Sequence, residues 1–165
     1  MSKKDAISKA SRVFIAPSAV LEGSIHLESE VSIWHGAVLR ADEGTLFIGR
    51  GSNIQDLCLV HCEEAKGLHV GQDVTVGHGA IVHGAFIGDE TLIGMGAILL
   101  AGSRVGAGCI LAAGSLLPEG AVIPDGEVWM GTPARKLRET TPEDMARIRS
   151  SSAHYQEQIK ERNYE

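Results

Sequence analysis

The chain has 165 residues, with 15 Lys and Arg against 21 Asp and Glu, so its formal net charge is −6. This acidic balance argues against nucleic-acid binding, which needs clustered basic residues to displace counterions, and against an anionic membrane surface. A hydrophobic share of 44% excludes a disordered chain, and only 4% aromatic residues with 20 Gly requires a core of aliphatic side chains.

The N-terminal segment MSKKDAISKASRVF has no apolar run typical of a signal peptide. The longest apolar stretch, residues 97–101, is too short to span a bilayer. With three Cys and no export signal, a disulfide framework is not expected. We therefore expect a cytoplasmic protein.

A six-residue repeat fills most of the chain. The interval between aliphatic positions departs from six only after Leu39, Val60 and Val82. The repeated positions are Ile15, Leu21, Leu27, Ile33, Leu39, Ile48, Ile54, Val60, Val70, Val76, Val82, Ile87, Ile93, Leu99, Val105, Leu111, Leu117 and Ile123, and Trp129 closes the series. Small or β-branched residues recur four positions later, and Gly often follows the aliphatic residue.

This period fits neither an α-helix nor a long strand, but it is typical of a β-helix built from hexapeptides. Three hexads close one triangular coil, so the repeat predicts about six coils at ~4.8 Å each, a prism of roughly 30 Å. The same Gly could instead belong to phosphate-binding loops, but neither GxGxxG nor GxxxxGK[ST] occurs. Cys58 and Cys109 fall in the small-residue column and are expected as packed thiols.

The repeat ends near residues 129–134, so we expect a β-helix domain over 1–140 and a helical segment over 141–165. Thr141, Pro142 and Asp144 match the N-cap, N1 and N3 positions of a helix running to about Arg162. Its apolar stripe, Met145, Ile148, Tyr155 and Ile159, should pack on the prism or on a neighbouring subunit.

Three of the seven histidines form a pattern. His61 and His83 occupy the same position one coil apart, so they should stack on one face at the inter-strand spacing of about 4.8 Å, close enough to share a metal ion. His78 falls on the preceding face, and the same chain is not expected to complete the set. The other four, His26, His35, His69 and His154, have no evident partner and are expected on polar surfaces.

Charged residues continue these columns, provided that the longer intervals loop out without disturbing the phase of the repeat. Arg40 should stack below His61, and Asp56 below His78 beside Gln55. Around a three-fold axis, Arg40 of one chain could then meet Asp56 of the next, and the two stacked imidazoles could meet His78. Three imidazoles with an open fourth position are the layout of a catalytic zinc site; the alternative is a polar interface that holds three histidines by chance.

The chain resembles the gamma-class carbonic anhydrases and anhydrase-like hexapeptide proteins from about Ser11 to Arg138. The stretches that carry the resemblance are VSIWHGAVLRADEG, IGRGSNIQDLCLVH, VGQDVTVGHGAIVHG, IGDETLIGMGAILL and GTPARKLR. The resemblance implies an all-β solenoid, a left-handed parallel β-helix of hexapeptide repeats with a C-terminal α-helix. It also implies a homotrimer with three intersubunit metal sites, each holding His61 and His83 of one chain and His78 of its neighbour.

The same resemblance suggests roles for further residues. Gln55 matches the residue that hydrogen-bonds the metal-bound hydroxide, and Asn53 matches the residue that orients it. Arg40 and Asp56 match an intersubunit ion pair with Asp42 nearby. For proton transfer, Glu43 and Glu64 are the candidates.

This chain departs from the best-studied members of the family in two places. Those members carry a long acidic loop after the first ligand, with a glutamate that exports protons; here residues 62–68 form only a short segment, in which Glu64 lies where that glutamate would align without gaps. No residue matches their late asparagine near the substrate. Tyr155 could approach the site in its place, and a core role for Tyr155 is equally consistent with the sequence.

These assignments predict reversible hydration of CO2 to bicarbonate by a hydroxide bound to Zn²⁺, with Fe²⁺ or Co²⁺ as alternatives. A second hypothesis is an anhydrase-like protein with little CO2 activity, acting as a thioesterase or an accessory metal-binding protein. Acyl transfer from CoA or an acyl carrier is a third hypothesis, and a purely structural trimer is a fourth.

Overall fold

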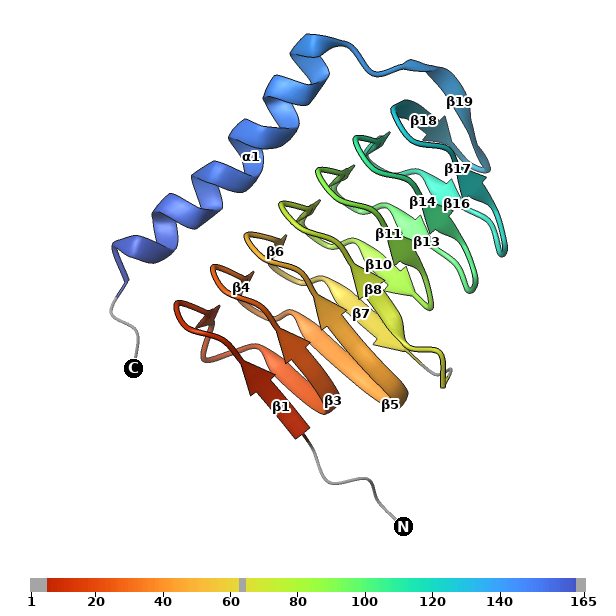
Figure 1. Cartoon of the computed structure of the whole chain (residues 1–165). Helices are drawn as coiled ribbons and strands as arrows, with labels where there is room; N and C mark the ends of the chain where they lie inside the picture. The colour runs from red at the N-terminus through yellow and green to blue at the C-terminus, as the bar shows by residue number, and fades with distance from the viewer. Residues whose placement is uncertain (1–5, 63–64, 163–165) are drawn as a thin grey trace.

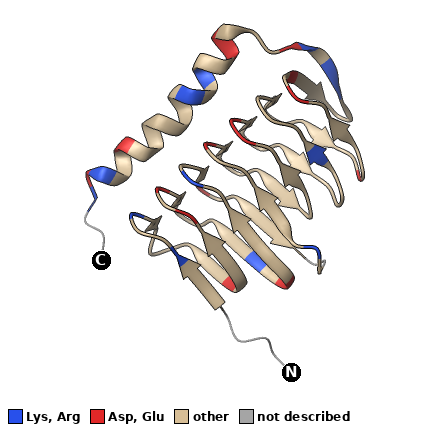
Figure 2. Cartoon of the chain, viewed as in Figure 1, with Lys and Arg blue, Asp and Glu red and all other residues tan. Residues whose placement is uncertain are grey.

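The structure is a computed structural model that describes residues 6–62 and 65–162. Short strands stack coil on coil into a prism, and one helix, α1 (Pro142–Lys160), runs back along its side toward the first coils (Figure 1). Figure 2 shows charged residues mainly in the turns and on the helix, while the strands are largely uncharged. This architecture confirms the predicted β-helix with a C-terminal helix.

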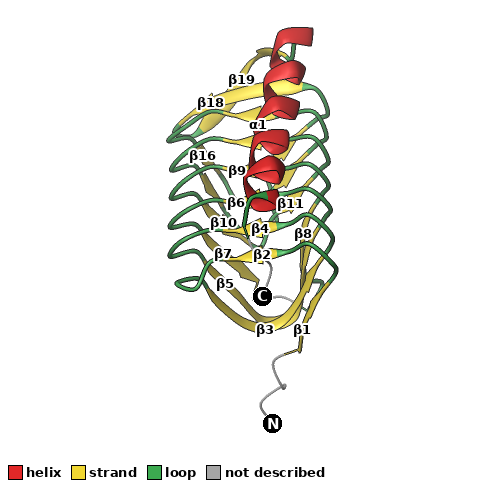
Figure 3. Cartoon of the chain, turned by 90° about the vertical axis from the view of Figure 1, so that its left-hand side faces the viewer, coloured by secondary structure: helices red, strands yellow, loops and turns green. Residues whose placement is uncertain are grey.

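Three faces make up the prism. The helix face is an eight-stranded sheet in which only β19 runs antiparallel. Its strands are β2 (Phe14–Ile15), β4 (Ser32–Ile33), β6 (Asn53–Ile54), β9 (Thr75–Val76), β12 (Leu92–Ile93), β15 (Ile110–Leu111), β18 (Glu127–Gly131) and β19 (Ala134–Glu139). Helix α1 lies over this face (Figure 3).

The other two faces share an eleven-stranded sheet, because β3 (Val20–Leu27) and β5 (Val38–Ile48) run through the corner between them. The histidine face consists of the first halves of β3 and β5 with β7 (Leu59–Cys62), β10 (Ile81–His83), β13 (Ile98–Leu99) and β16 (Leu116–Leu117). The ring face consists of their second halves with β1 (Ala6–Lys9), β8 (Leu68–Val70), β11 (Phe86–Ile87), β14 (Arg104–Val105) and β17 (Val122–Ile123).

The strand register confirms the predicted interior column. Leu39, Val60, Val82 and Leu99 pair in succession on the histidine face, and each is fully buried. The register holds across the irregular intervals, so the longer segments loop out without changing the phase of the repeat. Coils approach too closely for a side chain at some corners: a Cβ on Gly94 would lie 2.3 Å from the backbone nitrogen of Ala113.

The cysteines are free thiols, as expected. Cys58 and Cys109 are buried in the core, and burial raises the pKa of the Cys58 thiol to about 11. A thiol held protonated in this way is a packing group.

Helix α1 begins where the sequence predicts and ends at Lys160, two residues before the predicted Arg162. The Thr141 hydroxyl accepts from the backbone N–H of Asp144, whose carboxylate accepts from the N–H of Thr141, which completes a capping box. Ile148 and Ile159 are buried, so the helix packs on its own prism. The division into domains at residue 140 stays a prediction. In the described part of the chain, no helix has the length and apolar character of a membrane span.

Acid should loosen the start of this helix. The Arg138 guanidinium, together with the N–H and hydroxyl of Thr141, holds the pKa of Asp144 well below its usual range. A carboxyl whose pKa is lowered by folding stabilises the fold above its unfolded pKa, and that stabilisation is lost as the pH falls toward the folded pKa. We expect the urea midpoint to fall between about pH 5 and pH 2, and to fall less in Asp144→Asn. If the urea midpoint falls equally with pH in the wild-type protein and in Asp144→Asn, this prediction is wrong. Asp125→Asn is the matched control.

Candidate metal centre

His61 and His83 lie side by side on the histidine face. Their strands, β7 and β10, pair directly, with His83 opposite His61. The two ring centroids are 5.2 Å apart and the ring planes are inclined by 31°. Arg40 pairs with His61 one coil below. The structure therefore forms the column that the repeat predicts, with two imidazoles close enough to bind one ion.

His61 contacts a charged pair through a single nitrogen. Its Nε2 lies 2.8 Å from Oδ2 of Asp42 and 2.9 Å from Nη2 of Arg40, and Arg40 Nε contacts Asp42 Oδ1 at 3.1 Å. A carboxylate only accepts and a guanidinium only donates, so Nε2 cannot satisfy both in either protonation state. The hydrogen bond with His61, aided by the charge of Arg40, lowers the pKa of Asp42. The carboxylate is therefore charged at neutral pH and holds this ring in place.

His78 lies on the helix face, in the turn after β9. Its Nδ1 contacts Oδ2 of Asp56 at 3.0 Å, and the N–H of Gly79 donates to the carbonyl of Asp56 one coil below. Asp56 therefore stacks below His78 as predicted, but within one chain it pairs with that histidine and Arg40 pairs with Asp42.

One chain alone does not assemble the three-histidine set. Among residues 6–62 and 65–162, no group of three His, Cys, Asp or Glu side chains lies together in a metal-binding arrangement. The reason is geometric, because His61 and His83 lie on one face of the prism and His78 lies on another. Neutral imidazoles suit Zn²⁺, Fe²⁺ and Co²⁺ alike, so the donor chemistry fits a metal ion if two chains combine their faces.

Asn53 and Gln55 form an amide pair beside His78. Both are buried on the helix face. Gln55 donates through Nε2 to Asn53 Oδ1 at 3.1 Å, and the backbone N–H of His78 donates to Gln55 Oε1 at 3.1 Å. This contact brings Gln55 against the turn that holds the third histidine.

Tyr155 reaches the same region from α1. Its ring meets Trp34 edge-on with centroids 5.2 Å apart, and it lines a groove of about 470 Å³ together with Gln55 and His78. Burial raises the pKa of the Tyr155 phenol, so the hydroxyl stays protonated at neutral pH. The side chain thus both packs on the prism and faces the groove.

The two glutamates are placed unequally. Glu43 is exposed on β5. Its backbone carbonyl accepts from the thiol of Cys62, the residue after His61, at 3.3 Å, so Glu43 lies one coil below Cys62. Glu64 lies outside the described residues.

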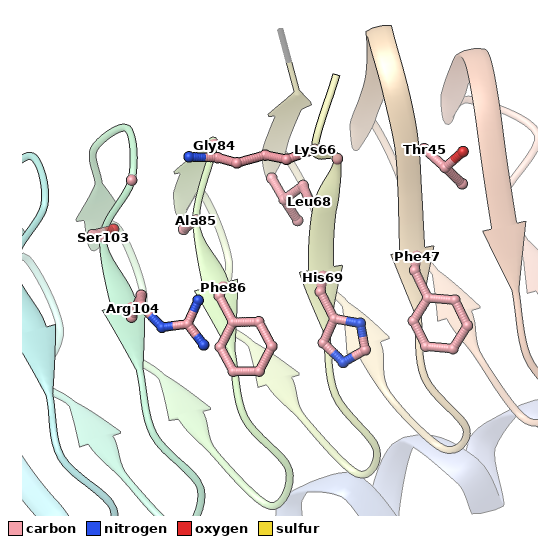
Figure 4. Close-up of a pocket in the computed structure, with 12 residues that line it drawn as sticks. Thr45, Phe47, Lys66, Leu68, His69, Gly84, Ala85, Phe86, Ser103 and Arg104 are labelled. Atoms are coloured by element: carbon pink, nitrogen blue, oxygen red, sulfur yellow. The ribbon is translucent and has the colours of Figure 1, made fainter. Parts of the chain in front are cut away.

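All four of the remaining histidines have partners that the sequence reasoning missed. His35 Nδ1 lies 3.1 Å from Oγ of Ser18, and His154 Nε2 lies 2.9 Å from Nε2 of Gln158. On the ring face, His26, Phe47, His69 and Phe86 stack with centroid spacings of 5.3, 4.9 and 5.1 Å, and the Arg104 guanidinium lies 4.2 Å from the Phe86 centroid. Figure 4 shows part of this ladder beside a pocket of about 350 Å³. The signal was present in the sequence, because all five residues hold the same position of the hexad in successive coils. Burial lowers the pKa of His69, which favours the neutral ring within the stack.

Comparison with known proteins gives sequence relatives over most of the chain. The family model for bacterial transferase hexapeptide (six repeats) matches residues 84–119. Gamma carbonic anhydrase 1, mitochondrial, of Arabidopsis thaliana is 46% identical over 148 residues, which cover 86% of this chain and 54% of that protein. A probable carbonic anhydrase of Methanocaldococcus jannaschii is 42% identical over 143 residues, covering 87% and 90%. The chain thus spans about half the length of the plant relatives.

Relatives with other names are also similar. Carnitine operon protein CaiE of Escherichia coli is 36% identical over 88% of this chain and 74% of its own. The crystal structure of a hexapeptide transferase family protein from Anaplasma phagocytophilum superposes with a TM-score of 0.91 at 35% identity, covering 96% and 94% of the two chains. A putative acetyltransferase of Bacillus cereus gives 0.90 at 35% identity, covering 96% and 92%.

Three observations indicate the same family. They are the fold, the two stacked imidazoles with a third beside a buried glutamine, and the archaeal relative matched over nine-tenths of its length. The chain belongs to the gamma-class carbonic anhydrase-like family of hexapeptide-repeat proteins.

Proposed function

We propose that this protein is a metalloenzyme that hydrates CO2 reversibly to bicarbonate, at sites shared between neighbouring subunits of a homotrimer. The observation that carries the proposal is that the three candidate metal ligands lie on two different faces of the prism. His61 and His83 are paired in register on one face, and His78 lies on the adjacent face against Gln55. Relatives named carbonic anhydrase support a metal cofactor in this family.

An outward apolar stripe on the histidine face supports association of subunits there. Six aliphatic residues pair in succession, one per coil, and none of them is fully buried in the single chain. They are Val20, Val38, Leu59, Ile81, Ile98 and Leu116. A continuous apolar stripe on a strand face is typical of a protein interface. Because the stripe runs beside His61 and His83, a neighbour seated on it would bring its own residues to these imidazoles.

When bound, a metal ion with three imidazole ligands would leave an open position and lower the pKa of water there toward neutrality. The chain's own residues have separate tasks around it. Asp42, itself paired with Arg40, holds the His61 ring. Gln55 uses one Nε2 hydrogen on Asn53 and keeps the other to orient the attacking oxygen. Exposed Glu43 passes the released proton to buffer.

Stopped-flow CO2 hydration tests the proposal. Zinc-loaded protein, and iron-loaded protein handled without oxygen, would be compared with His83→Ala as the baseline. We expect turnover well above that baseline in at least one metal form. Fully metallated wild-type protein that hydrates CO2 no faster than His83→Ala would contradict the proposal.

Acyl transfer is the second candidate, favoured by the Bacillus cereus relative described as a putative acetyltransferase. Calorimetry with acetyl-CoA and metal-stripped protein distinguishes the two. Saturable binding together with absent CO2 turnover would support acyl transfer, while a thioesterase would release CoA from the same probe.

A further inference from the structure

A continuous line of hydrogen bonds joins α1 to the turn that holds His78. Oγ of Ser151, on the helix, lies 3.0 Å from Oγ1 of Thr75 on β9. Thr75 Oγ1 accepts from Nδ2 of Asn53 at 3.0 Å. Asn53 and Gln55 are joined in turn, and Gln55 accepts from the N–H of His78. Thr75, Asn53 and Gln55 are all at most 5% exposed, so water cannot readily replace these partners.

Both ends of this line fix the orientation of the two amides. At one end, the N–H of His78 can only donate, so the Gln55 atom that faces it is Oε1. At the other end, Asn53 Nδ2 also lies 3.4 Å from the carbonyl of Val74, which can only accept. The two requirements agree, and they leave Gln55 with one Nε2 hydrogen beyond the bond to Asn53.

We propose that Thr75 and Ser151 are positioning residues, which hold the Asn53–Gln55 pair in place so that the free Nε2 hydrogen of Gln55 points into the site. This inference rests on the proposed function and extends it to the C-terminal helix. Without the Thr75 hydroxyl, Asn53 keeps only the longer contact to Val74, so the amide pair is held less firmly and the Nε2 donor of Gln55 is placed less precisely.

The helix has other polar contacts with the prism that do not reach the amide pair. Gln156 donates through Nε2 to Asp73 Oδ1 at 2.9 Å and to the carbonyl of Gly51 at 3.2 Å. Ser152, the neighbour of Ser151, donates to the carbonyl of Arg149 within the helix. Loss of the Gln156 contacts weakens helix docking, and loss of the Ser152 hydroxyl removes a bond within the helix, so both positions supply controls.

The test compares Thr75→Val, which keeps the shape, with Thr75→Ser, which keeps the hydroxyl. In the metal-loaded protein we expect kcat for CO2 hydration to fall about tenfold in Thr75→Val with little change in KM, and to recover in Thr75→Ser. Ser151→Ala should show a smaller loss in the same direction. Gln156→Ala and Ser152→Ala should leave kcat unchanged.

A second readout needs no catalysis. The side-chain amide signals of Gln55, assigned by their loss in Gln55→Glu, would be followed by ¹⁵N NMR in each variant. We expect them to shift and exchange faster with water in Thr75→Val and to return in Thr75→Ser. If wild-type protein lacks CO2 activity but these signals behave as expected, the proposed function fails and the positioning role stands. Unchanged signals in Thr75→Val, or an equal response to Thr75→Ser, would overturn the positioning role.

Discussion

Mixing two inactive variants should restore metal sites. His78→Ala and His83→Ala should each lose stoichiometric zinc, because each removes one of three protein ligands. If every site combines His61 and His83 of one subunit with His78 of the next, a His78→Ala subunit and a His83→Ala subunit still form one intact site between them. Each mixed cyclic trimer would then regain about a third of the wild-type sites.

Co-expression with two different affinity tags, followed by tandem purification and metal analysis, measures this recovery. CO2 hydration should rise in parallel with the bound zinc. His69→Ala, on the ring face, is the control and should keep its full metal content. If the mixed assemblies bind no more zinc than either variant alone, the sites do not draw their ligands from two chains.

A charge placed in the apolar stripe should separate the subunits. Ile98 lies in the stripe, one coil beyond Ile81 and away from the candidate ligands. Ile98→Glu would bury a carboxylate three times around a trimer, and an unpaired buried charge costs several kcal/mol. We expect a monomer by light scattering, with the β-sheet circular dichroism retained and with zinc binding and CO2 hydration lost together.

The matched control is Val122→Glu, which places the same charge at an outward aliphatic position on the ring face. Val122 is 54% exposed, so this variant should keep the wild-type mass and metal content. An Ile98→Glu protein that remains a trimer would show that subunits meet through another surface. A monomeric Ile98→Glu protein that still binds stoichiometric zinc would contradict the shared site.

Much of the candidate site could be predicted from spacing alone. A repeat of fixed length converts sequence separation into position, so the pairing of His61 with His83 and of Arg40 with His61 followed from counting hexads. The longer segment after Val60 did not disturb this, because a loop can leave the prism at a corner while the next strand resumes the hydrogen-bonded register. The capping box at Thr141 was readable for a similar reason, since it depends on residues three apart.

Other features arise only when distant segments meet. The bond between Ser151 and Thr75 depends on where the helix lands on the prism, and no local pattern encodes that distance. The ring ladder on the ring face was hidden because different kinds of side chain share one position of the repeat.

By itself, the sequence determined the coil, its interior column and the faces on which the three histidines lie, because each is set by the short period of the backbone. Only the tertiary structure decided which side chains contact each other between coils and between the helix and the prism. It showed that one nitrogen of His61 lies between Asp42 and Arg40, and that Oε1 of Gln55 faces the backbone N–H of His78. Hydrogen-bond direction depends on the atoms facing each group, and that is a property of packing, not of spacing.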